Sequence, residues 1–220
     1  MSLTTYTFSN CIAGFFEIAI EDARRLLPSR FTPLEVCYGR GVLVVNVYHF
    51  SESEVGPYDE VVYAIMTLPR LVDGVVPNGA VFPFQVATST QAAREHAIER
   101  WHLPHWPEDI RVEYQDEGER MIAKAWAGGT EIMKLQVNAR AWQKKVLLFQ
   151  SFMQDQDGTY MANIKYDGET SEHEEGTALI SLTLDHPYNA PLAEADIDDL
   201  AFREIWQRGV QTFQPLTTLS

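Results

Sequence analysis

One short stretch of the chain, residues 99–107, concentrates side chains that can do chemistry. Its sequence, Glu-Arg-Trp-His-Leu-Pro-His-Trp-Pro, holds two of the five tryptophans and two of the six histidines. Tryptophan and histidine rings are apolar in body and polar at one tip, so they suit the wall of a dry cavity that holds a polar ligand. Trp101 and Trp106 are therefore candidate ligand-binding residues, and His102 and His105 are candidate acid–base residues. Core tryptophans with surface or structural histidines are an equal alternative.

Glu60 is a second candidate, at the end of the segment Gly-Pro-Tyr-Asp-Glu (residues 56–60). It opens an apolar run at 61–68, so its carboxyl group can face the interior. There, desolvation raises the pKa of a carboxyl group and makes it a usable acid or base. A carboxylate at the rim of a turn is the alternative, and the local pattern slightly favours it. Tyr58 is a candidate ligand-binding residue in the same segment.

Short apolar and alternating runs dominate the chain and predict mostly β-strands. We expect strands at residues 5–9, 42–50, 61–68, 82–87, 110–115, 120–127, 131–137, 145–153, 161–166 and 178–184. Residues 13–20 fit a strand or the start of a helix. Helices are expected at residues 21–27, 91–101 and 196–210.

The order of these elements predicts how they pair. Residues 42–50 and 61–68 are expected to form a hairpin, and the strands between 110 and 166 a continuous β-meander. The acidic segment 167–176 is expected to be a solvated loop, and His173 within it lacks the second histidine that a zinc site needs. Because strands far outnumber helices, the expected architecture is an antiparallel barrel or sandwich with a few peripheral helices.

Length and charge exclude several classes of protein. The 220 residues suit one domain, expected to span 1–220. With 17 basic against 31 acidic residues the net charge is −14, so binding to nucleic acid or to an anionic membrane surface is disfavoured. No apolar run approaches a membrane span, no secretory signal is visible, and Cys11 and Cys37 show no CxxC spacing. We expect a cytoplasmic protein with no cofactor and no metal.

Three segments together resemble the acetoacetate decarboxylase family. They are residues 56–60, the helix and loop at 95–106, and the closing strand and loop at 178–192. The resemblance implies a mainly β (α+β) protein built on a closed or nearly closed antiparallel β-barrel, with a few short peripheral helices and a dry cavity. It also implies a small-molecule ligand or substrate as partner, and a symmetric homo-oligomer.

The residues that carry the family's chemistry are changed in this sequence. The family forms a Schiff base through the first lysine of a Tyr-Pro-Lys-Lys motif, and the matching residues, 103–106, are Leu-Pro-His-Trp. Lys124 and Lys134, on expected strands, are the only plausible substitutes. With a shift of one residue, a second family glutamate matches Asn46, which becomes a candidate ligand-binding residue. Only the glutamate equivalent to Glu60 is retained.

Three functional readings follow from these residues. In the first, an enzyme with altered chemistry uses Glu60 with His105 or His102 to move protons on a small oxo acid or enol, in a hydration, dehydration or tautomerisation. In the second, the same pocket binds a small molecule without converting it. In the third, a decarboxylase, which is a lyase, uses a displaced lysine. The first two readings weigh equally, and the third is the least favoured.

Overall fold

The computed structural model describes residues 3–174 and 176–219, which form a mainly β protein with few helices. In chain order the elements are β1 (Thr4–Ala19), α1 (Ile20–Arg25), β2 (Arg40–Glu52), β3 (Tyr58–Met66), β4 (Gly79–Thr88), α2 (Gln91–Trp101), β5 (Ile110–Asp116), β6 (Arg120–Ala127), β7 (Thr130–Asn138), β8 (Trp142–Gln154), β9 (Thr159–His173), β10 (Leu179–Leu182), the 3₁₀ helix η1 (Pro187–Leu192), β11 (Arg203–Phe213) and β12 (Thr217–Leu219). The predominance of strands confirms the fold class expected from the sequence.

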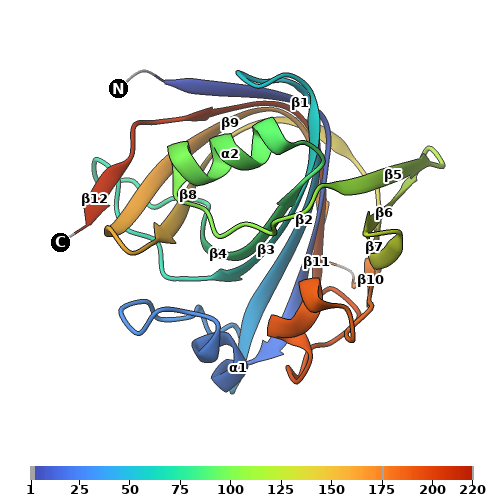
Figure 1. Ribbon diagram of the computed structural model, residues 1–220, viewed down its shortest axis with the longest axis horizontal. Helices are drawn as coiled ribbons and strands as arrows, with labels where there is room; N and C mark the ends of the chain where they lie inside the picture. Colours follow the sequence, from blue (N-terminus) through green and yellow to red (C-terminus); the bar gives the residue numbers. More distant parts are fainter. Residues whose placement is uncertain (1–2, 175, 220) are drawn as a thin grey trace.

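A closed barrel forms the body of the molecule, with strands in the order β11-β1-β2-β3-β4-β8-β9 and β9 pairing back to β11 (Figure 1). These pairs are antiparallel except β4 with β8, where Gly79 lies opposite Phe149 in a parallel register. Closure is therefore confirmed, but the expectation of a purely antiparallel barrel is wrong. Between β4 and β8 the chain leaves the barrel through residues 89–141, and a crossover of this length permits a parallel pair.

A second sheet, in the order β10-β7-β6-β5, covers the outer face of β1, β2 and β3. Ile12, Val47 and Val61 of the barrel share one buried core with Met133 and Leu135 of this sheet. Strands β1 to β3 therefore bury both of their faces. This two-sided burial explains why their sequences are nearly unbroken apolar runs rather than alternating ones.

The segment near the C-terminus is a strand, although its pattern predicted a helix. In place of the helix expected at 196–210, β11 begins at Arg203. Its alternation sends Ile205 and Gln207 into the barrel and Trp206 to the opposite face. The helix prediction is wrong because pairing with β1 and β9 outweighs the local helical spacing.

Other strands are longer, or pair differently, than the pattern predicted. The hairpin of 42–50 with 61–68 is confirmed as β2 and β3. The solvated loop expected at 167–176 is mostly wrong, because pairing with β8 and β11 extends β9 to His173. The meander is also wrong beyond β7, because β8 and β9 belong to the barrel. The separate strands expected near the N-terminus join as β1, with a register shift after Phe8.

Helix α2 lies across one end of the barrel (Figure 1). Thr90 caps it by accepting a hydrogen bond from Ala93 N at 3.2 Å. The helix ends at Trp101, whose ring packs 4.7 Å from that of Phe213 in the barrel. His102 then adopts a left-handed φ of 55° and turns the chain into the following loop. No helix within the described residues is both long enough and apolar enough to cross a membrane.

A pair of glycines forms the seam between β9 and β11, where the barrel closes. Gly168 lies opposite Gly209, and a Cβ added at Gly168 would overlap the Arg208 carbonyl oxygen. We expect Gly168→Ala to lower the free energy of unfolding in urea by about 2–3 kcal/mol, because overpacking forces the strands apart. Gly79→Ala is the matched control, since its added Cβ meets Phe149 at an ordinary 3.5 Å. Equal stability of the two variants would contradict a tight seam.

Candidate functional site

The interior of the barrel contains two adjoining cavities, of about 90 Å³ and about 120 Å³. Five residues line both of them, namely Asn46, Tyr48, Val81, Ile164 and Gln211. The smaller cavity is completed by Glu60, Val62, Pro83, Val86, Trp101, Leu103, Ser151, Met153 and Phe213. Most of this wall is apolar, so the few polar side chains are the ones that can orient a ligand.

Glu60 is the only carboxylic acid among the described residues that line the two cavities. It lies on β3 opposite Tyr48 of β2, and alternation sends it into the barrel while its neighbour Val61 joins the outer core. Its carboxyl group has no hydrogen-bond or ion-pair partner within residues 3–174 and 176–219. Desolvation raises the pKa of Glu60 to about 8, which favours the protonated form at neutral pH.

Besides Tyr48 and Trp101, three uncharged polar side chains share the smaller cavity with Glu60. Asn46 is on β2, Ser151 on β8 and Gln211 on β11, so they reach the cavity from different parts of the barrel wall. None of the three side chains has a hydrogen-bond partner in the part of the chain that the structure describes. Because these side chains face the cavity and are not engaged elsewhere among the described residues, they are suited to bind a molecule that enters it.

Several of the residues predicted from the sequence do meet in the barrel. Glu60, Asn46 and Trp101 all line the smaller cavity. The Trp101 indole Nε1 donates to the Tyr6 hydroxyl oxygen at 2.7 Å, which orients the ring. Tyr58 belongs to the aromatic cluster beside the cavity, with its ring 4.7 Å from that of Phe50, and is not among the residues that line the cavity.

The two histidines of the loop are not brought together with Glu60. His102 Nδ1 lies 2.6 Å from Asp155 Oδ2, and its ring stacks on Tyr160 at 4.0 Å. His105 Nδ1 lies 2.8 Å from the Trp106 carbonyl oxygen, and burial lowers the pKa of His105. Neither histidine lines the two barrel cavities. Proton transfer between Glu60 and either histidine therefore has no direct geometry in this structure.

Trp106 lies outside the barrel cavity, against the outer core. Its ring meets Tyr188 edge-on with the centroids 5.7 Å apart. Its backbone N–H donates to the Val86 carbonyl oxygen at 2.8 Å, so the loop runs alongside β4. Leu103 is the loop residue that reaches the cavity.

The lysines proposed as substitutes lie on the second sheet. Lys124 and Lys134 face each other across β6 and β7. The neighbouring Ala123 and Ala125 are buried in the outer core, so alternation places both lysines on the opposite face. Among the described residues, no lysine lines either barrel cavity. The displaced-lysine reading therefore has no candidate residue at this site.

Tyr48, Ser151 and Gln211 were not identified from the sequence. Period-two alternation places Tyr48 on the same face as Asn46, so this residue could have been found from β2 alone. Gln211 falls just after the segment that was assigned to a helix, and Ser151 belongs to a strand whose inner face depends on its pairing. These two required the tertiary structure.

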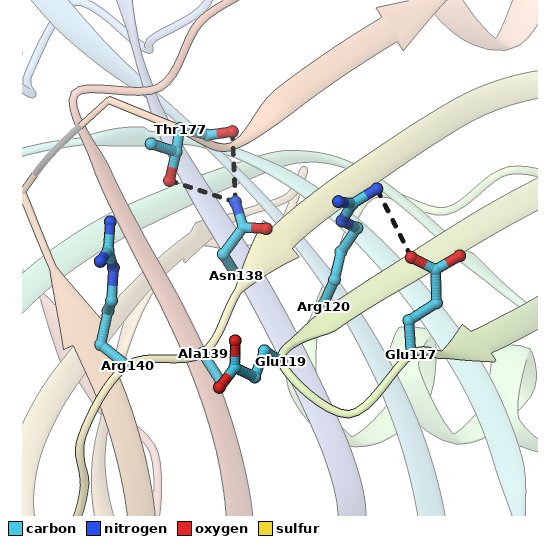
Figure 2. Close-up of a pocket in the computed structure, with 7 residues that line it drawn as sticks. All are labelled: Glu117, Glu119, Arg120, Asn138, Ala139, Arg140 and Thr177. Atoms are coloured by element: carbon cyan, nitrogen blue, oxygen red, sulfur yellow. Dashed lines mark hydrogen bonds and ion pairs between the residues drawn. The ribbon is translucent and has the colours of Figure 1, made fainter.

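A second, open cleft lies between the end of β7 and the β5–β6 turn (Figure 2). It measures about 580 Å³ and is lined by Glu117, Glu119, Arg120, Asn138, Ala139, Arg140 and Thr177. Its polar groups engage each other: Arg120 pairs with Glu117 at 3.4 Å, and Asn138 Nδ2 donates to Thr177 Oγ1 at 3.1 Å. The barrel cavity is therefore the stronger candidate, because Glu60, Asn46, Ser151 and Gln211 lack such partners among the described residues.

Comparison with known proteins identifies the family of this chain. The sequence matches the model of the acetoacetate decarboxylase (ADC) family over residues 3–216, so the chain belongs to that family. Among curated proteins, none matches the sequence.

Solved structures with the same fold include acetoacetate decarboxylases and a biosynthetic enzyme. An acetoacetate decarboxylase is 12% identical, with 100% of this chain and 90% of that chain covered and a TM-score of 0.67. The enzyme from Legionella pneumophila subsp. pneumophila str. Philadelphia 1 is 14% identical, with 99% and 87% covered and a TM-score of 0.65. The enduracididine biosynthesis enzyme MppR, complexed with pyruvate, is 9% identical, with 99% and 90% covered and a TM-score of 0.67. At these identities the likeness shows the fold alone.

The burial of Glu60 predicts how stability depends on pH. The folded protein holds the Glu60 proton up to about pH 8, whereas the unfolded chain releases it near pH 4.5. Unfolding therefore releases a proton in this window, and wild-type stability falls as pH rises through it. Glu60→Gln lacks this loss, so its stability relative to wild type should increase by roughly 2–4 kcal/mol between pH 5 and 8 in denaturant titrations. A constant difference across that range would show that Glu60 titrates normally.

Proposed function

We propose that this member of the family binds a small organic molecule in the barrel cavity and that Glu60 exchanges a proton with it. The observation that carries the proposal is the Glu60 carboxyl group, which faces the cavity and has no hydrogen-bond or ion-pair partner among the described residues. A carboxyl group with a pKa of about 8 populates both protonation states near neutral pH, so it can act as donor or acceptor. Tautomerisation, hydration and dehydration of a carbonyl compound need such transfers and no covalent amine.

The neighbouring side chains support this role. Asn46 and Gln211 carry amide N–H donors that can hold a carbonyl oxygen, and Ser151 adds a hydroxyl group. The mostly apolar wall lowers the local dielectric constant, which strengthens each of these interactions. The similar structure of MppR is complexed with pyruvate, and the ketone carbonyl of pyruvate is the group that the proposed ligand shares with it.

The other two functional hypotheses differ in how well the cavity supports them. Binding without turnover would use the same cavity and the same residues, and it differs only in whether Glu60 moves a proton. Schiff-base decarboxylation has no support at this site, because no lysine among the described residues lines the cavity. His102 and His105 take no part in the proposal, since neither faces the cavity.

The proposal predicts exchange of carbon-bound protons that depends on Glu60. With 2-butanone, hydroxyacetone and pyruvate in D₂O, we expect wild type to speed α-proton exchange at least tenfold over buffer for one or more of them, as measured by ¹H NMR. The rate should rise with pH, reach half of its maximum near pH 8, where half of the Glu60 carboxyl groups are ionised, and level off above that pH. Glu60→Gln should lose this acceleration.

Glu54→Gln is the matched control, because Glu54 is exposed on the same hairpin and does not line the cavity. It should exchange protons as wild type does. Equal exchange by wild type and Glu60→Gln would remove Glu60 from the reaction. An absence of exchange by wild type with all three probes would favour binding without turnover.

A further inference from the structure

The barrel cavity is complementary to one class of ligand more than to others. Resting on the proposed function, we infer that it takes an uncharged polar molecule, such as a ketone or an amide, and discriminates against carboxylates. The inference follows from which groups line the cavity and which of them are left without partners.

The first observation is the absence of positive charge. The residues that line the two cavities include no lysine, arginine or histidine among those that the structure describes. Burial is the sole cause of the raised pKa of Glu60, so no nearby cation stabilises its carboxylate either. A ligand carboxylate would therefore enter a mostly apolar space with nothing to replace its hydration, and Glu60 would repel it whenever ionised.

The second observation is the supply of neutral hydrogen-bonding groups. Asn46, Ser151 and Gln211 offer amide and hydroxyl groups that can both donate and accept, and none has a partner in residues 3–174 and 176–219. Protonated Glu60 adds an O–H donor and a carbonyl acceptor to this set. A carbonyl, hydroxyl or amide group satisfies such a site without any change in charge.

The third observation is the volume of the cavities and the apolar character of most of the side chains that line them. Cavities of about 90 Å³ and about 120 Å³ suit a small molecule, given that one water takes up about 30 Å³ in the liquid. Val62, Val81 and Met153 supply apolar walls beside the polar groups. A cationic ligand would require Glu60 to ionise in this environment, which its burial opposes near neutral pH.

A matched pair of probes tests the inference. Pyruvamide and pyruvate have the same number of heavy atoms and the same ketone, and they differ in a neutral amide against a carboxylate. In isothermal titration calorimetry at pH 7, with saturation-transfer NMR as a second readout, we expect pyruvamide to bind the full-length protein at least tenfold more tightly than pyruvate.

A variant with a cation in the wall provides the converse test. Gln211→Lys places an ammonium group beside the cavity with little change in side-chain length, and we expect it to shift the ratio of the two affinities at least tenfold toward pyruvate. Gln214→Lys is the matched control, because Gln214 is exposed beyond the end of β11 and does not line the cavity. It should keep the wild-type preference.

The outcomes separate this inference from the proposed function. Wild-type binding of pyruvate as tightly as pyruvamide, or binding of neither probe, overturns the inference. If Glu60-dependent proton exchange is observed at the same time, the proposed function survives that failure. Preference for pyruvamide without any Glu60-dependent exchange supports the neutral-ligand site and overturns the proposed proton transfer instead.

Discussion

The two-sided burial of strands β1, β2 and β3 is the constraint on which the rest of the structure depends. Their outer residues, such as Val47 and Val61, pack on the second sheet, so they cannot also line the barrel. Their inner residues, such as Asn46 and Glu60, are then held on a rigid wall that is covered from behind. A cavity can persist inside the barrel because its wall is anchored by the outer core.

This arrangement keeps polar groups in an environment that normally excludes them. The carboxyl group of Glu60 has no partner among the described residues, and burial disfavours its charge. Leaving such groups unsatisfied costs folding free energy, and sites of this kind are commonly functional. The cost is tolerable here because the surrounding strands are fully paired and packed on both faces.

The family fold is retained while the loop after α2 has changed its chemistry. Where the resemblance places the Schiff-base lysine, the chain has His105, which hydrogen-bonds to the Trp106 carbonyl oxygen beside β4. Leu103 is the residue from this loop that faces the cavity, so the loop contributes an apolar surface. Glu60, on which the proposed function depends, belongs to a barrel strand, which is a more rigid position than a loop.

The sequence by itself determined the mainly β class, the family and the β2–β3 hairpin, because local period-two patterns and motif spacing carry that information. It also proposed Glu60, Asn46 and Trp101 as candidates, and the structure places all three in the wall of the cavity. Only the tertiary structure decided that β4 and β8 pair in parallel and that the segment from Arg203 is a strand. Both the parallel pair and the strand from Arg203 depend on pairing between segments far apart in the sequence, which local sequence patterns do not encode. Likewise, the direction in which His102 points depends on Asp155, which lies far along the chain.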